Sequence, residues 1–78
     1  MDRKERILKL SAISKELWKY FAFYLRDEKL SDDMWQDMFG RLAKFSERYK
    51  GTEFEIYVDS YIKAMECYLV EIERAKNA

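Results

Sequence analysis

The sequence predicts an all-α protein, an up-down-up antiparallel three-helix bundle, and three observations support this. Proline is absent and glycine occurs only twice in 78 residues, which leaves few turn residues for a β-sheet protein. Hydrophobic residues make up 49% of the chain and charged residues 38%, a mixture typical of amphipathic helices around one core. Apolar residues recur at helical spacing in three segments that are separated by short breaks. We therefore expect a single domain, residues 1–78, with helices at about 3–28, 32–50 and 53–76.

Each expected helix begins with a capping signal. Asp2 precedes the first helix and Ser31 precedes the second, and both residue types accept hydrogen bonds from the first turn. Thr52 and Glu55 form a capping-box pattern at the start of the third helix. Gly51 is placed to end the second helix in the left-handed conformation. Both connections are short, so successive helices should run antiparallel.

The core is expected along one seam of each helix, where apolar residues recur at alternating spacings of three and four. The three seams are Ile7, Leu10, Ser14, Leu17, Phe21 and Tyr24; then Trp35, Met38, Leu42, Phe45 and Tyr49; and then Phe54, Val58, Tyr61, Met65, Tyr68, Ile72 and Ala75.

The apolar arcs of the first and third helices are broader than contact with two neighbouring helices requires. Aromatic side chains are enriched at protein interfaces because they offer large contact area at low entropic cost. The expected interface residues are Tyr20, Phe23, Ile56 and Tyr57. The alternative is that these are isolated exposed apolar residues, which are normal on protein surfaces. The sequence thus predicts a small accessory or regulatory module that binds a protein partner or a second copy of itself.

The formal net charge is zero, with 15 basic and 15 acidic residues, but the charges are segregated. The start of the first helix and the end of the second should share one basic pole: Arg3, Lys4, Arg6, Lys9, Arg41, Lys44, Arg48 and Lys50. The opposite pole should be acidic, with Asp27, Glu28, Asp32, Asp33 and Asp37. The basic pole either pairs with Glu53, Glu55 and Asp59 or binds an acidic partner, and nucleic-acid binding there is the alternative function.

The residue types that most catalysis needs are missing or isolated. The chain has no histidine, no glycine-rich phosphate loop and a single cysteine, Cys67, which is expected to be a packing residue. We expect no enzyme activity, no catalytic residues, no metal site, no cofactor and no small-molecule substrate. A lone cysteine fits a reducing compartment, and we expect a cytoplasmic protein without a signal peptide or membrane segment.

Gly40 falls in the middle of the second helix, on its outward face. A glycine at such a position costs up to about 1 kcal/mol relative to alanine. Close approach of another backbone would explain it, and so would chance variation of the sequence.

Overall fold

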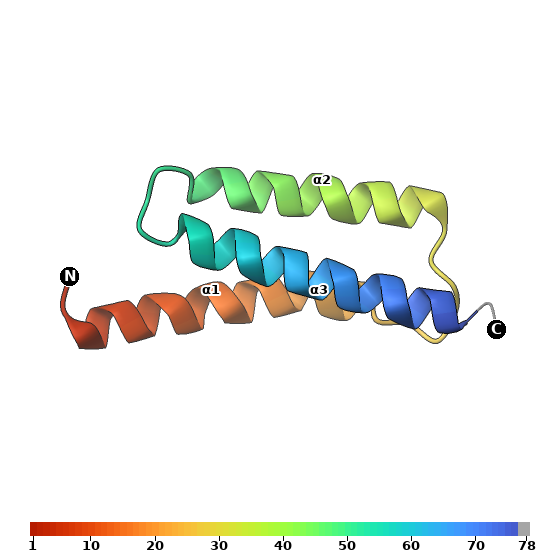
Figure 1. Ribbon diagram of the computed structural model, residues 1–78, viewed down its shortest axis with the longest axis horizontal. Coiled ribbons are helices and arrows are strands. Elements are labelled where there is room, and N and C mark those ends of the chain that lie inside the picture. The colour runs from red at the N-terminus through yellow and green to blue at the C-terminus, as the bar shows by residue number, and fades with distance from the viewer. Residues whose placement is uncertain (77–78) are drawn as a thin grey trace.

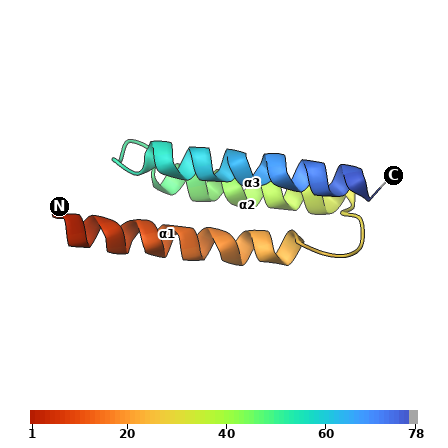
Figure 2. The same ribbon diagram turned by 60° about the horizontal axis from the view of Figure 1, so that its bottom comes forward.

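The computed structural model describes residues 1–76 and confirms the three-helix bundle. Helix α1 spans Arg3–Tyr24, α2 spans Asp32–Arg48 and α3 spans Glu55–Ala75. The helices run up, down and up along one axis, so α1 and α3 are parallel to each other and α2 is antiparallel to both (Figure 1). The molecule measures 48 × 20 × 16 Å, and each helix packs against the other two (Figure 2).

The core lies along the middle of the bundle axis and is almost entirely apolar. Seams of all three helices and one residue of each connection contribute to it. Its buried hydrophobic members are Ile13, Leu17, Phe21, Tyr24, Leu30, Met38, Leu42, Phe45, Phe54, Val58, Ile62 and Leu69. Burial of this apolar surface is the main favourable term for a chain of this size.

Helix α1 departs from its expected seam at the N-terminal end. Ile7 is 52% exposed because the first two turns of α1 extend beyond the connection between α2 and α3, where no other helix covers them (Figure 1). Ile13, nearly two turns further along, is buried instead.

The expected seam of the third helix is wrong by a rotation toward α2. Tyr68, which was expected in the core, is 55% exposed, and Ala75 is exposed. Ile62 and Leu69 are buried instead. The cause is that α3 must cover both α1 and α2, so its buried side points between them rather than along the line of its largest aromatic residues.

Two of the three expected caps are confirmed. The Glu5 backbone N–H donates to the Asp2 carboxylate at 2.8 Å, and the Met34 N–H donates to the Ser31 hydroxyl at 3.2 Å. The capping box at Thr52 is wrong, because α3 begins at Glu55 rather than at residue 53 and has no side-chain cap at its start.

The connection between α2 and α3, residues 49–54, is held by local bonds. Gly51 has φ of +78°, as expected for a left-handed residue after a helix. The Thr52 hydroxyl donates to the Tyr49 carbonyl at 2.6 Å and accepts from the Phe54 N–H at 3.2 Å. Thr52 therefore closes the turn instead of capping the helix.

The connection between α1 and α2, residues 25–31, is held by the far end of α3. The α1 helix ends at Tyr24, four residues before the expected end. Leu30 then enters the core, and its N–H donates to the buried carboxylate of Glu73 at 2.6 Å. The Lys76 ammonium donates to the carbonyls of Arg26 and Glu28 at 2.6 and 2.9 Å, and it also pairs with Glu73.

Candidate interaction surfaces

An uncharged aromatic strip runs along the open side of the pair α1 and α3. It consists of Trp18, Leu25, Tyr57, Tyr61 and Tyr68. Trp18 is 44% exposed and Tyr68 is 55% exposed, while Tyr57 and Tyr61 are half-buried between the helices. Contiguous aromatic surface of this kind marks protein interfaces more often than scattered apolar residues do.

Contacts between the two helices fix the register of the strip. The hydroxyls of Ser14 and Tyr57 hydrogen-bond to each other across a sequence separation of 43 residues. One turn along, the Trp18 indole is a hydrogen-bond partner of Tyr61, again 43 residues away. Because α1 and α3 run in parallel, the same separation places Leu25 level with Tyr68. The paired positions of the strip therefore extend over about three helical turns.

The Tyr61 hydroxyl shows how far the strip is shielded from water. Burial raises the pKa of Tyr61, and the neighbouring Tyr57 raises it further, while the hydrogen bond with Trp18 acts in the opposite direction. The Tyr57 and Tyr61 rings lie 5.9 Å apart. The floor of the strip is thus fixed by ring contacts, and its rim of Trp18, Leu25 and Tyr68 is free to contact another chain.

The four expected interface residues do not form one face. Tyr20 lies on the side of α1 that faces α2, where its ring meets Phe45 edge-on at 5.9 Å. Phe23 is 53% exposed on the same side, with the Arg26 guanidinium 4.7 Å from its ring centre. Tyr57 belongs to the aromatic strip. Ile56, which is 79% exposed, lies beside it on the outer side of α3.

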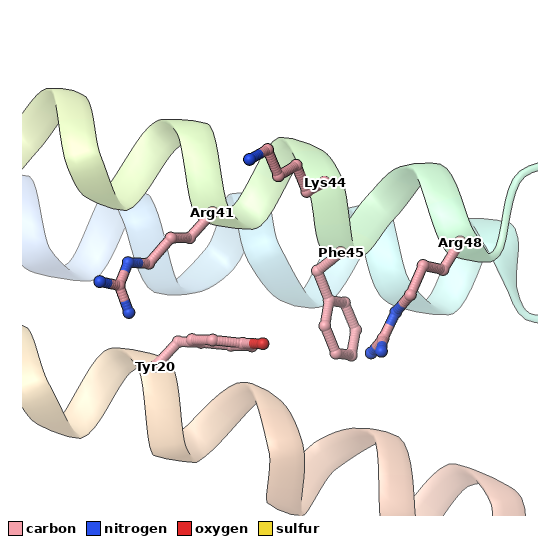
Figure 3. A pocket seen from close by; sticks show the side chains of 5 residues that line it. All are labelled: Tyr20, Arg41, Lys44, Phe45 and Arg48. Carbon is pink, nitrogen blue, oxygen red and sulfur yellow. The ribbon is translucent and has the colours of Figure 1, made fainter.

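A basic groove lies on the surface between α1 and α2, which are packed against each other beneath it. Its volume is about 280 Å³, and it is lined by Tyr20, Arg41, Lys44, Phe45 and Arg48. Arg41 and Arg48 reach toward α1 on either side of Phe45, whereas Lys44 points away from α1 (Figure 3). The Arg48 guanidinium packs 4.6 Å from the Phe45 ring centre and bonds to Glu16, a hydrogen bond that raises its pKa.

Arg41 is held in place at the other end of this groove. Its Nε donates to Oδ2 of Asp37 at 3.1 Å, and the same oxygen accepts from the Tyr24 hydroxyl at 2.6 Å. The bond from Tyr24 is the main cause that lowers the pKa of Asp37. Burial, together with Asp37, raises the pKa of Tyr24 to about 12.

The eight residues of the expected basic pole have two fates. Arg6, Arg41, Arg48 and Lys50 pair with Glu53, Asp37, Glu16 and Glu47. Arg3, Lys4, Lys9 and Lys44 have no carboxylate within 4 Å among residues 1–76. Pairing of the first helix with the start of the third therefore occurs at Arg6 and Glu53, whereas Asp59 accepts instead from the Ser46 hydroxyl at 2.6 Å.

No group of three or more Cys, Asp or Glu side chains between residues 1 and 76 is arranged to hold a metal ion. Cys67 is exposed on α3 rather than packed, contrary to the expectation from sequence. None of the three helices combines the length and apolarity that a membrane-spanning segment needs.

The sequence signals for the aromatic strip were present but were interpreted differently. Trp18 lies at the edge of the broad apolar arc of the first helix, and Tyr68 fits the seam spacing of the third. Only Tyr68 belongs to an expected core seam, and no seam includes Trp18. The spacing of apolar residues predicts which side of a helix is apolar, but it does not fix how the helix is rotated about its axis. A rotation of about 60° moves an aromatic residue from the core to the surface without changing the spacing, so spacing alone does not identify it as exposed.

Comparison of the chain with protein-family models, curated proteins and solved structures finds no match.

Proposed function

We propose that this chain is a non-enzymatic interaction module that binds one amphipathic helix of a partner protein along the aromatic strip. The observation that carries the proposal is the exposure of Trp18, Leu25 and Tyr68 in one uncharged row across two helices. A parallel pair of helices leaves a lengthwise groove, and a fourth helix laid into it completes a four-helix arrangement. The lone, exposed Cys67 is compatible with a cytoplasmic setting for this role.

The chemistry of the strip specifies the partner helix. No charged side chain belongs to the strip, so the partner face should be apolar, with anchors at spacings of three and four residues. Lys15 and Lys19 follow on the exposed side of α1, beyond Trp18. Acidic residues beside the apolar face of the partner would complement them and set the orientation of the helix.

Site-specific photo-crosslinking in the organism that encodes the chain tests this function. A benzoylphenylalanine at position 68 should give a discrete adduct with a helical segment of one other protein. The same group at Lys63, exposed on another side of α3, should give none. A synthetic peptide of the crosslinked segment should then bind purified Trp18→Ala about 30-fold more weakly than wild type, which is about 2 kcal/mol.

Phe39→Ala is the matched control, because Phe39 is an aromatic residue of similar exposure that lies on α2, outside the strip. Its affinity for the peptide should equal that of wild type. Equal affinities of Trp18→Ala and Phe39→Ala would reject the strip as the binding site. An adduct at position 68 that contains only a second copy of the chain would replace the partner helix with self-association.

Nucleic-acid binding at the basic pole is the second candidate, and the basic groove is the observation that favours it. Here Arg41, Lys44 and Arg48 line one wall and Tyr20 the other. Glu16 and Asp37 already neutralise two of the three cations, which weighs against a polyanionic ligand. Binding of a single-stranded oligonucleotide should fall steeply with salt and vanish when all three are changed to Glu. Undetectable binding at low salt would reject this function.

A further inference from the structure

The outer face of α2 has a charge order that complements the helix dipole and that the aromatic strip does not use. We call this surface the α2 outer face and define it by Asp33, Asp37, Gly40, Lys44 and Arg48. These positions recur at spacings of three and four, so they share one side of the helix, and all five are exposed, with Asp37 and Arg48 turned toward α1, where they meet Tyr24 and Glu16. Its first half is acidic and its second half is basic, with Gly40 at the centre.

Gly40 has no role within its own chain. It lies inside α2 with an ordinary helical backbone, since the only described residue with positive φ is Gly51. A Cβ added at Gly40 would meet nothing within 4 Å, so no packing inside the chain excludes a side chain there. Glycine permits another backbone to approach closely, and here only a second molecule could do so.

We infer that a second copy of this chain packs antiparallel against the α2 outer face, with a two-fold axis at Gly40. In that arrangement Asp33 and Asp37 of each copy face the basic half of the other. A parallel arrangement would instead place like charges opposite one another. The formal net charge of zero adds no repulsion between two copies.

The ion pairs of Asp37 and Arg48 within the chain reduce the charge of this face but leave hydrogen-bonding groups free for a partner. Arg41 and Tyr24 both use Oδ2 of Asp37, which leaves Oδ1 available. Arg48 uses Nη2 for Glu16 and keeps its other N–H groups, while Lys44 has no carboxylate within 4 Å among the described residues. Each half of the face therefore holds fixed, partly satisfied groups that a second copy can complete.

Phe23 supplies apolar contact beside the axis. Along α1 it lies between Tyr20, which contacts Phe45, and Tyr24, which bonds to Asp37. On α2, Gly40 lies between Asp37 and Phe45, so Phe23 and Gly40 lie at about the same height along the bundle axis. The half-exposed Phe23 ring thus flanks the point of closest approach, and this gives the residue identified in the sequence a place in the interface.

Sedimentation equilibrium of the full chain, from micromolar to millimolar concentration, tests the inference. Wild type should populate a dimer that weakens as salt is added. Lys44→Glu should weaken dimerisation about tenfold or more, because it sets an acidic residue against Asp33 and Asp37 of the other copy. Lys63→Glu makes the same change of charge on α3 and should leave the dimer intact. Asp33→Lys alone should also weaken the dimer, because it sets a lysine against Arg48 of the other copy.

Gly40→Leu separates association from folding. Leucine favours helix over glycine and has free space in the single chain, so thermal unfolding of the monomer should move to higher temperature. Dimerisation should nevertheless be lost, because the leucine holds the two helices apart. Trp18→Ala should leave the dimer unchanged, so this inference and the proposed function succeed or fail separately.

Three results would overturn the two-fold packing. The first is a wild-type chain that remains a monomer throughout the concentration range at low salt. The second is a dimer that is indifferent to both Lys44→Glu and Gly40→Leu. The third is a monomer that binds an oligothymidylate probe through Lys44 and Arg48, which would assign the basic half to nucleic acid.

Discussion

The two connections of the bundle are built in opposite ways. Residues 49–54 are closed by their own neighbours, through the positive φ of Gly51 and the hydroxyl of Thr52. Residues 25–31 are closed from a distance, by Glu73 and Lys76 at the end of α3. The first connection can form as soon as α2 does. The second exists only when α3 is docked, so it ties together all three helices at one end of the molecule.

This contrast predicts where the stability of the fold is concentrated. In a turn held by local bonds, the loss of one hydrogen bond lowers the free energy of unfolding only a little, because water replaces the lost partner. Loss of the buried Glu73 carboxylate leaves the Leu30 N–H without its acceptor in the protein interior, and it removes the counter-charge of the Lys76 ammonium. Substitutions in the distant connection should therefore cost more than substitutions in the local one.

The largest expected effect is that of Glu73→Ala. Loss of the buried carboxylate should lower the free energy of unfolding by about 2–3 kcal/mol, the cost of leaving groups bonded to a charge unpaired. For a domain of this size the midpoint of thermal unfolding should fall by about 10–20 °C. Glu71→Ala is the control, since Glu71 is exposed and pairs only with Arg74 one turn away. A Glu71→Ala chain should stay within about 0.5 kcal/mol of wild type.

Acid should weaken the same connection in wild type. Burial acts to raise the pKa of Glu73, but the Leu30 N–H and Lys76 outweigh it, and the pKa is lowered from the ordinary 4.5. The stabilising contribution is therefore fully present above pH 4.5 and is lost as the pH falls through the lower pKa of the folded state. Urea unfolding at a series of pH values should show this slope, and Glu73→Gln should show less of it. Parallel pH profiles for the two chains would contradict this account.

The same contrast explains what could be predicted from the sequence. Gly51, Asp2 and Ser31 act on residues three or four positions away, and their predicted roles are confirmed. The position of Leu30 in the connection after α1 is fixed by Glu73, which lies 43 positions along the chain. No local pattern marks it, and a glutamate between Ile72 and Arg74 gives no indication that it is buried.

The surfaces follow the same rule. The charge order along α2 can be read from one helix, because it depends only on the order of residues within that helix. The aromatic strip depends on how α1 and α3 are rotated about their axes, which is decided by packing against α2. Tyr68 was therefore expected in the core although it is 55% exposed, and the four expected interface residues do not share one face.

The smallest expected effect on stability is that of replacing each glycine by alanine. An added Cβ meets no atom within 4 Å at either position, but only Gly51 has a positive φ. Gly51 has positive φ, so Gly51→Ala should lower the free energy of unfolding by about 1 kcal/mol through backbone strain alone, since its Cβ meets no atom within 4 Å. Gly40→Ala should raise the free energy of unfolding of the monomer by up to about 1 kcal/mol, because alanine favours the helix. Urea unfolding of both variants at a concentration where the chain is monomeric measures the difference. Two shifts of the same sign would show that the turn at Gly51 does not depend on its left-handed backbone, and the local connection would then owe its shape to Thr52.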